Sequence, residues 1–147
     1  MRKKQNARKE YTTHSSDETT QLGRRLAAQL KPGSIVLLRG DLGAGKTTLV
    51  KGIAEGFQAA RAEDVTSPTF TLIHEYRANA VTIFHIDLYR IDTQRELDTL
   101  ALDDLIGNNN VLLIEWGEKF ERFVRERDVE IAIAHAGGDQ RTITIED

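Results

Sequence analysis

The sequence contains no cysteine, only two prolines and a single tryptophan. Without cysteine the chain can form neither disulfides nor thiolate metal sites, and this composition fits a reducing compartment. The histidines do not replace them, because His14, His74 and His135 show no metal-ligand spacing relative to one another. The composition therefore excludes disulfide-stabilised folds and structural zinc sites of the cysteine type.

Long apolar segments are also missing. Runs such as residues 35–38 and 111–114 are far too short to span a bilayer. The first ten residues are polar and no apolar segment follows them, so we predict no secretory signal and expect a cytoplasmic protein. The chain has 147 residues, 39% of them hydrophobic, and this predicts one domain with a sizeable core.

Charge is unevenly distributed along the chain. The net charge is −3 at pH 7, yet residues 1–10 hold five basic side chains against one glutamate. We predict a disordered basic tail at residues 1–10 and a single domain at residues 11–147. A basic tail can attract RNA, but we favour a simple solvated end, because the acidic body does not by itself attract a phosphate backbone.

Glycine, in contrast, is concentrated in one stretch. Residues 40–47 read GDLGAGKT and match the phosphate-binding pattern G-x-x-x-x-G-K-[ST] (Walker A) without a mismatch. Residues 34–39 before this loop, with the apolar run 35–38 at their centre, predict a buried strand, and residues 46–57 after it predict a helix. This is the context that a P-loop needs, because loop amides and the helix start bind phosphate oxygens.

The loop predicts a nucleotide site. Lys46 is expected to reach the β- and γ-phosphates, and the Thr47 hydroxyl is expected to ligate Mg²⁺. The predicted nucleotide-binding residues are Asp41, Leu42, Gly43, Ala44, Gly45, Lys46, Thr47 and Thr48.

The rest of the chain alternates between strand and helix patterns. Predicted helices cover residues 16–30, about 94–102 and part of 118–127, and predicted strands cover 70–76, 81–87, 111–114, 129–133 and 143–145. Gly23 inside the first helix suggests close approach of another backbone or a ligand. These patterns predict an α/β fold: one P-loop NTPase-type domain with a mostly parallel central sheet flanked by helices and an antiparallel C-terminal hairpin.

Two predicted strands end in an acidic residue. Asp87 closes residues 81–87, and Glu115 follows the apolar run 111–114 in the usual setting of a Walker B acid. Catalysis needs carboxylates near the γ-phosphate, and in open α/β sheets such groups follow the carboxyl ends of strands. We expect Thr47 and Glu115 to hold the metal and Asp87 to position or deprotonate the attacking water, although the spacing leaves the reverse assignment open.

Other residues are weaker candidates. His85 lies two residues before Asp87 on the same strand face, so a hydrogen bond within the site and an ordinary structural role are both open. Trp116 is either a partner contact or a packing residue, and Arg90 is either a transition-state charge or a surface ion pair. Hydroxyls that could sense the γ-phosphate, as switch segments do, are those of Thr66, Ser67, Thr69 and Thr71.

Four of these segments together resemble the TsaE family, the small P-loop ATPases of bacterial tRNA threonylcarbamoyladenosine biosynthesis. They are GDLGAGKTT at residues 40–48, SPTFTL at 67–72, HIDLYR at 85–90, and Glu115-Trp116. The resemblance covers residues 15–135. The chain departs from the family pattern at Gly117, where many members have proline.

The resemblance implies a function. It implies ATP and Mg²⁺ as ligands, a TsaB–TsaD-type complex as partner, and tRNA as an indirect partner through that complex. It also implies an ATPase that is weak alone, with Lys46, Asp87 and Glu115 as its catalytic residues. By the same resemblance, residues 15–19 and 133–136 would hold the adenine.

Two other functions compete with this interpretation. A small-molecule kinase would need an acceptor site and an arginine-rich lid, for which Arg122, Arg125 and Arg127 are the available cluster. A nucleotide-gated interaction module would use hydrolysis only as a timer. A GTPase is disfavoured, because the sequence has no N-K-x-D guanine-binding motif.

Overall fold

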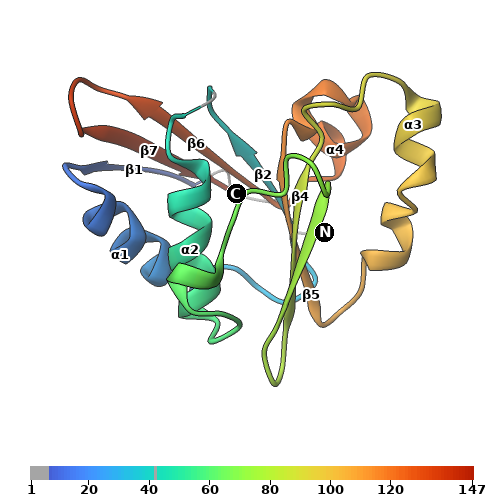
Figure 1. The fold of residues 1–147 in the computed structure, drawn as a ribbon, viewed down its shortest axis with the longest axis horizontal. Helices are drawn as coiled ribbons and strands as arrows, with labels where there is room; N and C mark the ends of the chain where they lie inside the picture. Colours follow the sequence, from blue (N-terminus) through green and yellow to red (C-terminus); the bar gives the residue numbers. More distant parts are fainter. Residues whose placement is uncertain (1–6, 42) are drawn as a thin grey trace.

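A seven-stranded mixed sheet forms the centre of the molecule, with helices on both of its faces (Figure 1). The structure is a computed structural model, and it describes residues 7–41 and 43–147. Its strands are β1 (Arg8–Thr13), β2 (Ile35–Arg39), β3 (Ile73–Arg77), β4 (Thr82–Asp87), β5 (Asn110–Glu115), β6 (Val129–His135) and β7 (Arg141–Glu146). Its α-helices are α1 (Ser16–Ala27), α2 (Lys46–Gly56), α3 (Gln94–Thr99) and α4 (Glu121–Glu126), with short 3₁₀ turns at Ala62–Asp64, Leu102–Leu105 and Gly117–Lys119.

The strands lie in the order β1-β7-β6-β2-β5-β4-β3. The four inner strands β6, β2, β5 and β4 are parallel. β3 pairs antiparallel with β4 at one edge, and β7 and then β1 extend the other edge antiparallel to their neighbours. The carboxyl ends of the parallel strands therefore meet at one edge of the sheet, which is where open α/β sheets bind ligands.

Side-chain alternation along the inner strands creates two hydrophobic cores. On β2, Val36 and Leu38 pack with α1 and α2, whereas Ile35 and Leu37 pack on the opposite face with residues from α3 and α4. Strands buried on both faces read as continuous apolar runs, which explains why residues 111–114 carry no polar side chain. This fold confirms the predicted α/β class and the antiparallel C-terminal hairpin.

The N-terminal segment differs from the prediction. Residues 8–10 belong to β1 and pair with β7, so their assignment to a disordered tail was wrong. Residues 1–6 lie outside the described part of the chain. α1 also ends at Ala27 rather than at residue 30, and α3 ends at Thr99 rather than near 102. No local pattern marks β1, because its strand conformation depends on the edge that β7 offers.

Helices α1 and α2 approach each other at backbone distance. A Cβ atom built on Gly52 would lie 2.0 Å from the Thr20 carbonyl oxygen, and one built on Gly23 would lie 2.4 Å from the Leu49 carbonyl oxygen. Gly23 therefore lies within its helix because another backbone passes there, one of the two reasons considered from the sequence. The close contact fixes α2, and with it the P-loop, against α1.

Within the described ranges, no helix has the length and apolar character needed to cross a membrane.

We predict that Gly52→Ala destabilises the fold by about 1–3 kcal/mol, because the added methyl group meets backbone that cannot move aside. Helix propensity alone predicts the opposite sign, a gain of about 0.5–1 kcal/mol. Urea denaturation measures the difference. Lys51→Ala on the same helix is the matched control and should change stability by less than about 0.5 kcal/mol. A more stable Gly52→Ala variant would contradict the close packing.

Candidate functional site

A hollow of about 280 Å³ lies at the carboxyl edge of the parallel strands, between the start of α2 and the ends of β4 and β5. All nine residues of its lining were singled out in the sequence, and two of them, Ser67 and Thr69, come from the segment before β3. The lining residues are Gly43, Gly45, Lys46, Thr47, Thr48, Ser67, Thr69, Asp87 and Glu115. Asp41 and Ala44 belong to the same loop but do not line the hollow, and Leu42 lies outside the described residues.

The loop before α2 has the backbone that the glycine pattern predicts. Gly43 and Gly45 adopt φ values of 78° and 110°, which side chains rarely permit. Gly45 is the N-cap of α2, and it has no side chain with which to bond the first-turn amides. In contrast, the Ser15 and Thr93 side chains cap α1 and α3.

The charges in the first helical turns follow the same division. α1 and α3 have acidic residues in their first turns, whereas α2 has none. The start of α2 therefore combines uncapped amides with an absence of negative side chains, and this suits it to bind a phosphate.

The Lys46 side chain is almost completely buried and has three contacts. Its Nζ atom donates to the Gly40 carbonyl oxygen at 2.6 Å and lies 3.6 Å from Glu115 Oε1. The same ammonium group lies 4.4 Å from the centre of the Trp116 ring. A buried ammonium group needs such partners, because desolvation is costly for an isolated charge.

Asp87 and Glu115 lie side by side. Parallel pairing of β4 with β5 sets them directly in register, and both residues are only 4% exposed. Asp87 accepts hydrogen bonds from the Thr69 hydroxyl at 3.2 Å and from the Tyr89 amide at 2.9 Å. Since neighbouring parallel strands lie about 5 Å apart, the two carboxylates form one acidic cluster facing the P-loop.

The charges of this cluster do not balance. Two buried carboxylates face one buried ammonium group, and within the described ranges no lysine or arginine forms an ion pair with Asp87. Among those residues there is also no group of three His, Cys, Asp or Glu that could hold a metal unaided. The arrangement fits Mg²⁺, which binds proteins through one or two carboxylates and completes its shell with water and phosphate oxygens.

A chain of hydroxyls connects Asp87 with the segment before β3. Thr69 donates to Asp87, so its oxygen accepts from Ser67 at 2.7 Å. Thr66 and Thr71 do not line the hollow. Phe70, in the middle of this segment, is 83% exposed, and the Arg90 guanidinium lies 5.3 Å from the centre of its ring.

The Thr66 backbone is held from the other side by β3. Its amide donates to the Tyr76 hydroxyl, and its carbonyl accepts from His74 Nδ1. Burial raises the pKa of the Tyr76 phenol, and the bond from the Thr66 amide offsets part of that rise. The phenol therefore stays neutral at physiological pH and can accept this bond.

Two other candidates, Arg122 and Trp116, do not line the hollow. Arg122 pairs with Asp103 and Glu126 on the face that α4 covers, so it forms no lid over the P-loop. The Trp116 ring packs against Lys46 and against Tyr89, with 5.1 Å between the two aromatic ring centres.

Sequence reasoning missed two contacts from the β6–β7 hairpin. Arg141 Nε donates to the Ala44 carbonyl at 2.9 Å, and His135 Nε2 donates to the Gly43 carbonyl at 3.1 Å. Both bonds fix P-loop carbonyls and use none of the loop amides. No local motif marks these two residues, because the hairpin approaches the loop only in the folded chain.

Of the two segments expected to contact adenine, residues 15–19 contribute to the lining of a second hollow near the loop, whereas residues 133–136 do not line it. This small hollow beside Gly45 has a lining that includes residues from the start of α1 and from the hairpin. It is lined by Ser15, Ser16, Thr19, Gly45, Thr48, Asp139 and Arg141. Adenine contact itself stays a prediction.

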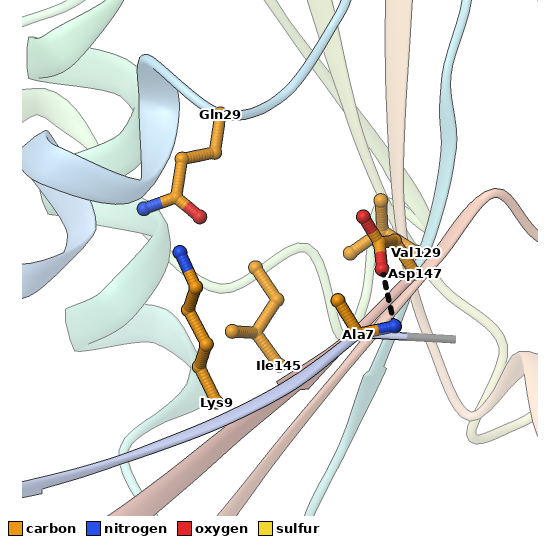
Figure 2. A pocket seen from close by; sticks show the side chains of 6 residues that line it. All are labelled: Ala7, Lys9, Gln29, Val129, Ile145 and Asp147. Atoms are coloured by element: carbon orange, nitrogen blue, oxygen red, sulfur yellow. Dashed lines mark hydrogen bonds between the residues drawn. The ribbon is translucent and has the colours of Figure 1, made fainter. Parts of the chain in front are cut away.

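A separate hollow of about 110 Å³ lies at the opposite end of the sheet, where β6 begins and β7 ends (Figure 2). Figure 2 shows Lys9 and Gln29 on one side and the bond from the Ala7 amide to Asp147 on the other. None of the predicted site residues lines it, so we assign no chemistry to it.

Comparison with known proteins agrees with this geometry. The profile of a family described as "Threonylcarbamoyl adenosine biosynthesis protein TsaE" matches residues 13–143. A Bacillus subtilis protein named tRNA threonylcarbamoyladenosine biosynthesis protein TsaE is 40% identical over 134 residues, which are 91% of this chain and 82% of the relative. A Rickettsia conorii protein of the same name is 37% identical, over 92% of this chain and 76% of the relative.

The fold has a counterpart among solved structures. The crystal structure of YdiB from Bacillus subtilis superposes with a TM-score of 0.76 and 34% sequence identity, and the match covers 98% of this chain and 88% of that one. The profile match, the relatives and this structure each span most of the chain, and they confirm the resemblance found in its motifs. The chain belongs to the TsaE family, whose members act in the biosynthesis of threonylcarbamoyladenosine in tRNA.

Proposed function

We propose that this chain is a Mg²⁺-dependent ATPase that supports a TsaB–TsaD-type complex in forming threonylcarbamoyladenosine next to the anticodon of tRNA. One observation carries the catalytic part of the proposal. The uncapped start of α2 faces two buried carboxylates across a single hollow. A phosphate cradle with adjacent acids is the arrangement that phosphoryl transfer requires.

In this proposal the P-loop and Lys46 bind the triphosphate. Loop amides contact the phosphate oxygens, and Lys46 exchanges its present contact with the Gly40 carbonyl for the β- and γ-phosphates. The Ala44 and Gly43 carbonyls are occupied by the hairpin, which limits rotation of the loop. The protein thus holds the cradle ready before the nucleotide arrives.

The acids and Thr47 would complete the site. We assign Mg²⁺ binding to Thr47 and Glu115 and the orientation or deprotonation of the attacking water to Asp87. Bound Mg²⁺ would neutralise charge on the β- and γ-phosphate oxygens. The symmetric register of the two acids is also compatible with the exchanged roles.

The partner part of the proposal follows from the family. Relatives at 34–40% identity carry the name of this biosynthetic pathway. We infer that the chain acts with the complex that modifies tRNA, in the cytoplasm, and that it meets tRNA through that complex. Low turnover by the isolated chain is expected on this basis.

A nucleotide-gated interaction module is the second candidate function. The hydroxyl chain from Asp87 to Ser67 connects the site to the segment that exposes Phe70. Nucleotide binding and hydrolysis could thereby change the conformation of this exposed segment. The output of the protein would then be a changed surface for a partner, and not a chemical product. Comparing turnover of the chain alone with turnover in the presence of partner proteins separates the two, because a pure timer shows no matched increase in modified tRNA.

We predict that Lys46→Ala weakens ATP binding by about 10- to 100-fold, through loss of a charge-assisted contact of roughly 1.5–3 kcal/mol. Calorimetric titration with ATP and Mg²⁺ measures the change, and circular dichroism checks the fold. The control is Lys31→Ala, an exposed lysine beyond α1 that does not line the hollow. Undiminished affinity in Lys46→Ala would exclude the cradle as the ATP site.

We predict that Asp87→Asn keeps the fold and ATP binding but lowers turnover by about 100-fold or more, because the amide cannot accept a proton. Phosphate release measured at saturating ATP tests this. Asp92→Asn is the matched control, since Asp92 is exposed, pairs with Lys119 and does not line the hollow. Normal hydrolysis by Asp87→Asn would remove this residue from the catalytic role.

A further inference from the structure

One buried histidine contacts the site without lining the hollow. The His85 side chain on β4 is fully buried, and its Nε2 atom lies 2.5 Å from Glu115 Oε2. Its other ring nitrogen, Nδ1, has no hydrogen-bond partner within the described residues. The imidazole thus makes a single polar contact, and that contact is to a site carboxylate.

The contact orients the Glu115 carboxylate. A carboxylate only accepts hydrogen bonds, so His85 Nε2 carries the proton and donates it. The two carboxylate oxygens then have different partners, His85 at Oε2 and Lys46 at Oε1. Because the terminal torsion of glutamate is otherwise broad, the His85 bond determines which oxygen faces the P-loop.

Packing alone does not explain a histidine at this position. The positions of β4 that point toward α2 alternate as Ile83, His85 and Asp87, and Ile83 is wholly apolar and wholly buried. An isoleucine at position 85 would continue that core without leaving a buried Nδ1 unpaired, which costs roughly 1–3 kcal/mol. We therefore attribute the histidine at this position to the bond between its Nε2 atom and Glu115, which offsets the cost of the unpaired Nδ1 atom.

We propose that His85 is a positioning residue that holds Glu115 in the orientation needed to bind Mg²⁺ beside the nucleotide. This inference rests on the proposed function, in which Glu115 is a metal ligand. Partners of this kind fix the ligands of many metal sites, and their loss typically lowers metal affinity or activity 10- to 100-fold. His85 itself contacts neither nucleotide nor metal in this arrangement.

Two substitutions of similar polarity separate this role from packing. Gln can place its amide nitrogen as many bonds from the backbone as His Nε2, and Asn as many as His Nδ1. His85→Gln therefore retains a donor for Glu115, whereas His85→Asn loses it. The quantity to measure is the ratio of affinities for a non-hydrolysable ATP analogue with Mg²⁺ and with EDTA, by calorimetry.

We expect His85→Asn to lower this ratio by about tenfold and His85→Gln to keep it within about twofold of wild type. Affinity in EDTA should be equal in all three proteins. His74→Asn is the matched control, because His74 lies opposite His85 on β3 and contacts the Thr66 carbonyl instead of a site acid. Its ratio should equal that of wild type.

A double-mutant cycle tests whether His85 acts through Glu115. In a Glu115→Gln background, His85→Asn should cause no further loss in the ratio, because the carboxylate that His85 orients toward the metal is already gone. Urea denaturation of each variant records stability separately. A purely structural role would lower stability in both backgrounds and leave the ratio unchanged.

The outcomes separate a failure of the proposed function from a failure of the role assigned to His85. A wild-type chain that binds the analogue equally well with and without Mg²⁺ contradicts the proposed function and this inference with it. A magnesium-dependent wild type whose folded His85→Asn variant keeps the full ratio contradicts only the role of His85. Independent effects of His85→Asn and Glu115→Gln contradict it as well.

Discussion

The parallel pairing of β4 with β5 is the constraint on which the proposed site depends. It sets Asp87 directly beside Glu115 at the carboxyl edge of the sheet, and it turns both side chains toward α2. Both buried acids have polar partners: Glu115 contacts His85 and Lys46, and Asp87 accepts from the Tyr89 amide and the Thr69 hydroxyl. The fold therefore holds two negative charges together at the place where we propose that Mg²⁺ binds.

The remaining elements keep the P-loop in place opposite those acids. Backbone contact between α1 and α2 fixes the helix behind the loop, and the β6–β7 hairpin binds two loop carbonyls from the other side. Lys46 connects the two halves of the site, since it contacts the loop at Gly40 and the acidic cluster at Glu115. A phosphate that drew Lys46 away from Glu115 would thus change the contacts of the acidic cluster as well.

The sequence was sufficient to predict the P-loop, the inner strands and the two acids, because each has a local signature: a glycine pattern, an apolar run, or an acid at the end of such a run. It was also sufficient to predict the C-terminal hairpin and the family. It was not sufficient for β1, for Arg141 and His135, or for the choice of His85 as the partner of Glu115. Those features depend on which strands become neighbours. Residue 8 meets residue 146, and residue 141 meets residue 44, only after the sheet has formed.

A crystal structure of the chain with a non-hydrolysable ATP analogue and Mg²⁺ tests the central claim most directly. The account predicts the phosphates on the amides at the start of α2 and the metal at about 2.0–2.1 Å from Thr47 and one of the two carboxylates. It also predicts that the other carboxylate faces the γ-phosphate. A nucleotide bound elsewhere, or Asp87 and Glu115 both turned away from the phosphates, would contradict it.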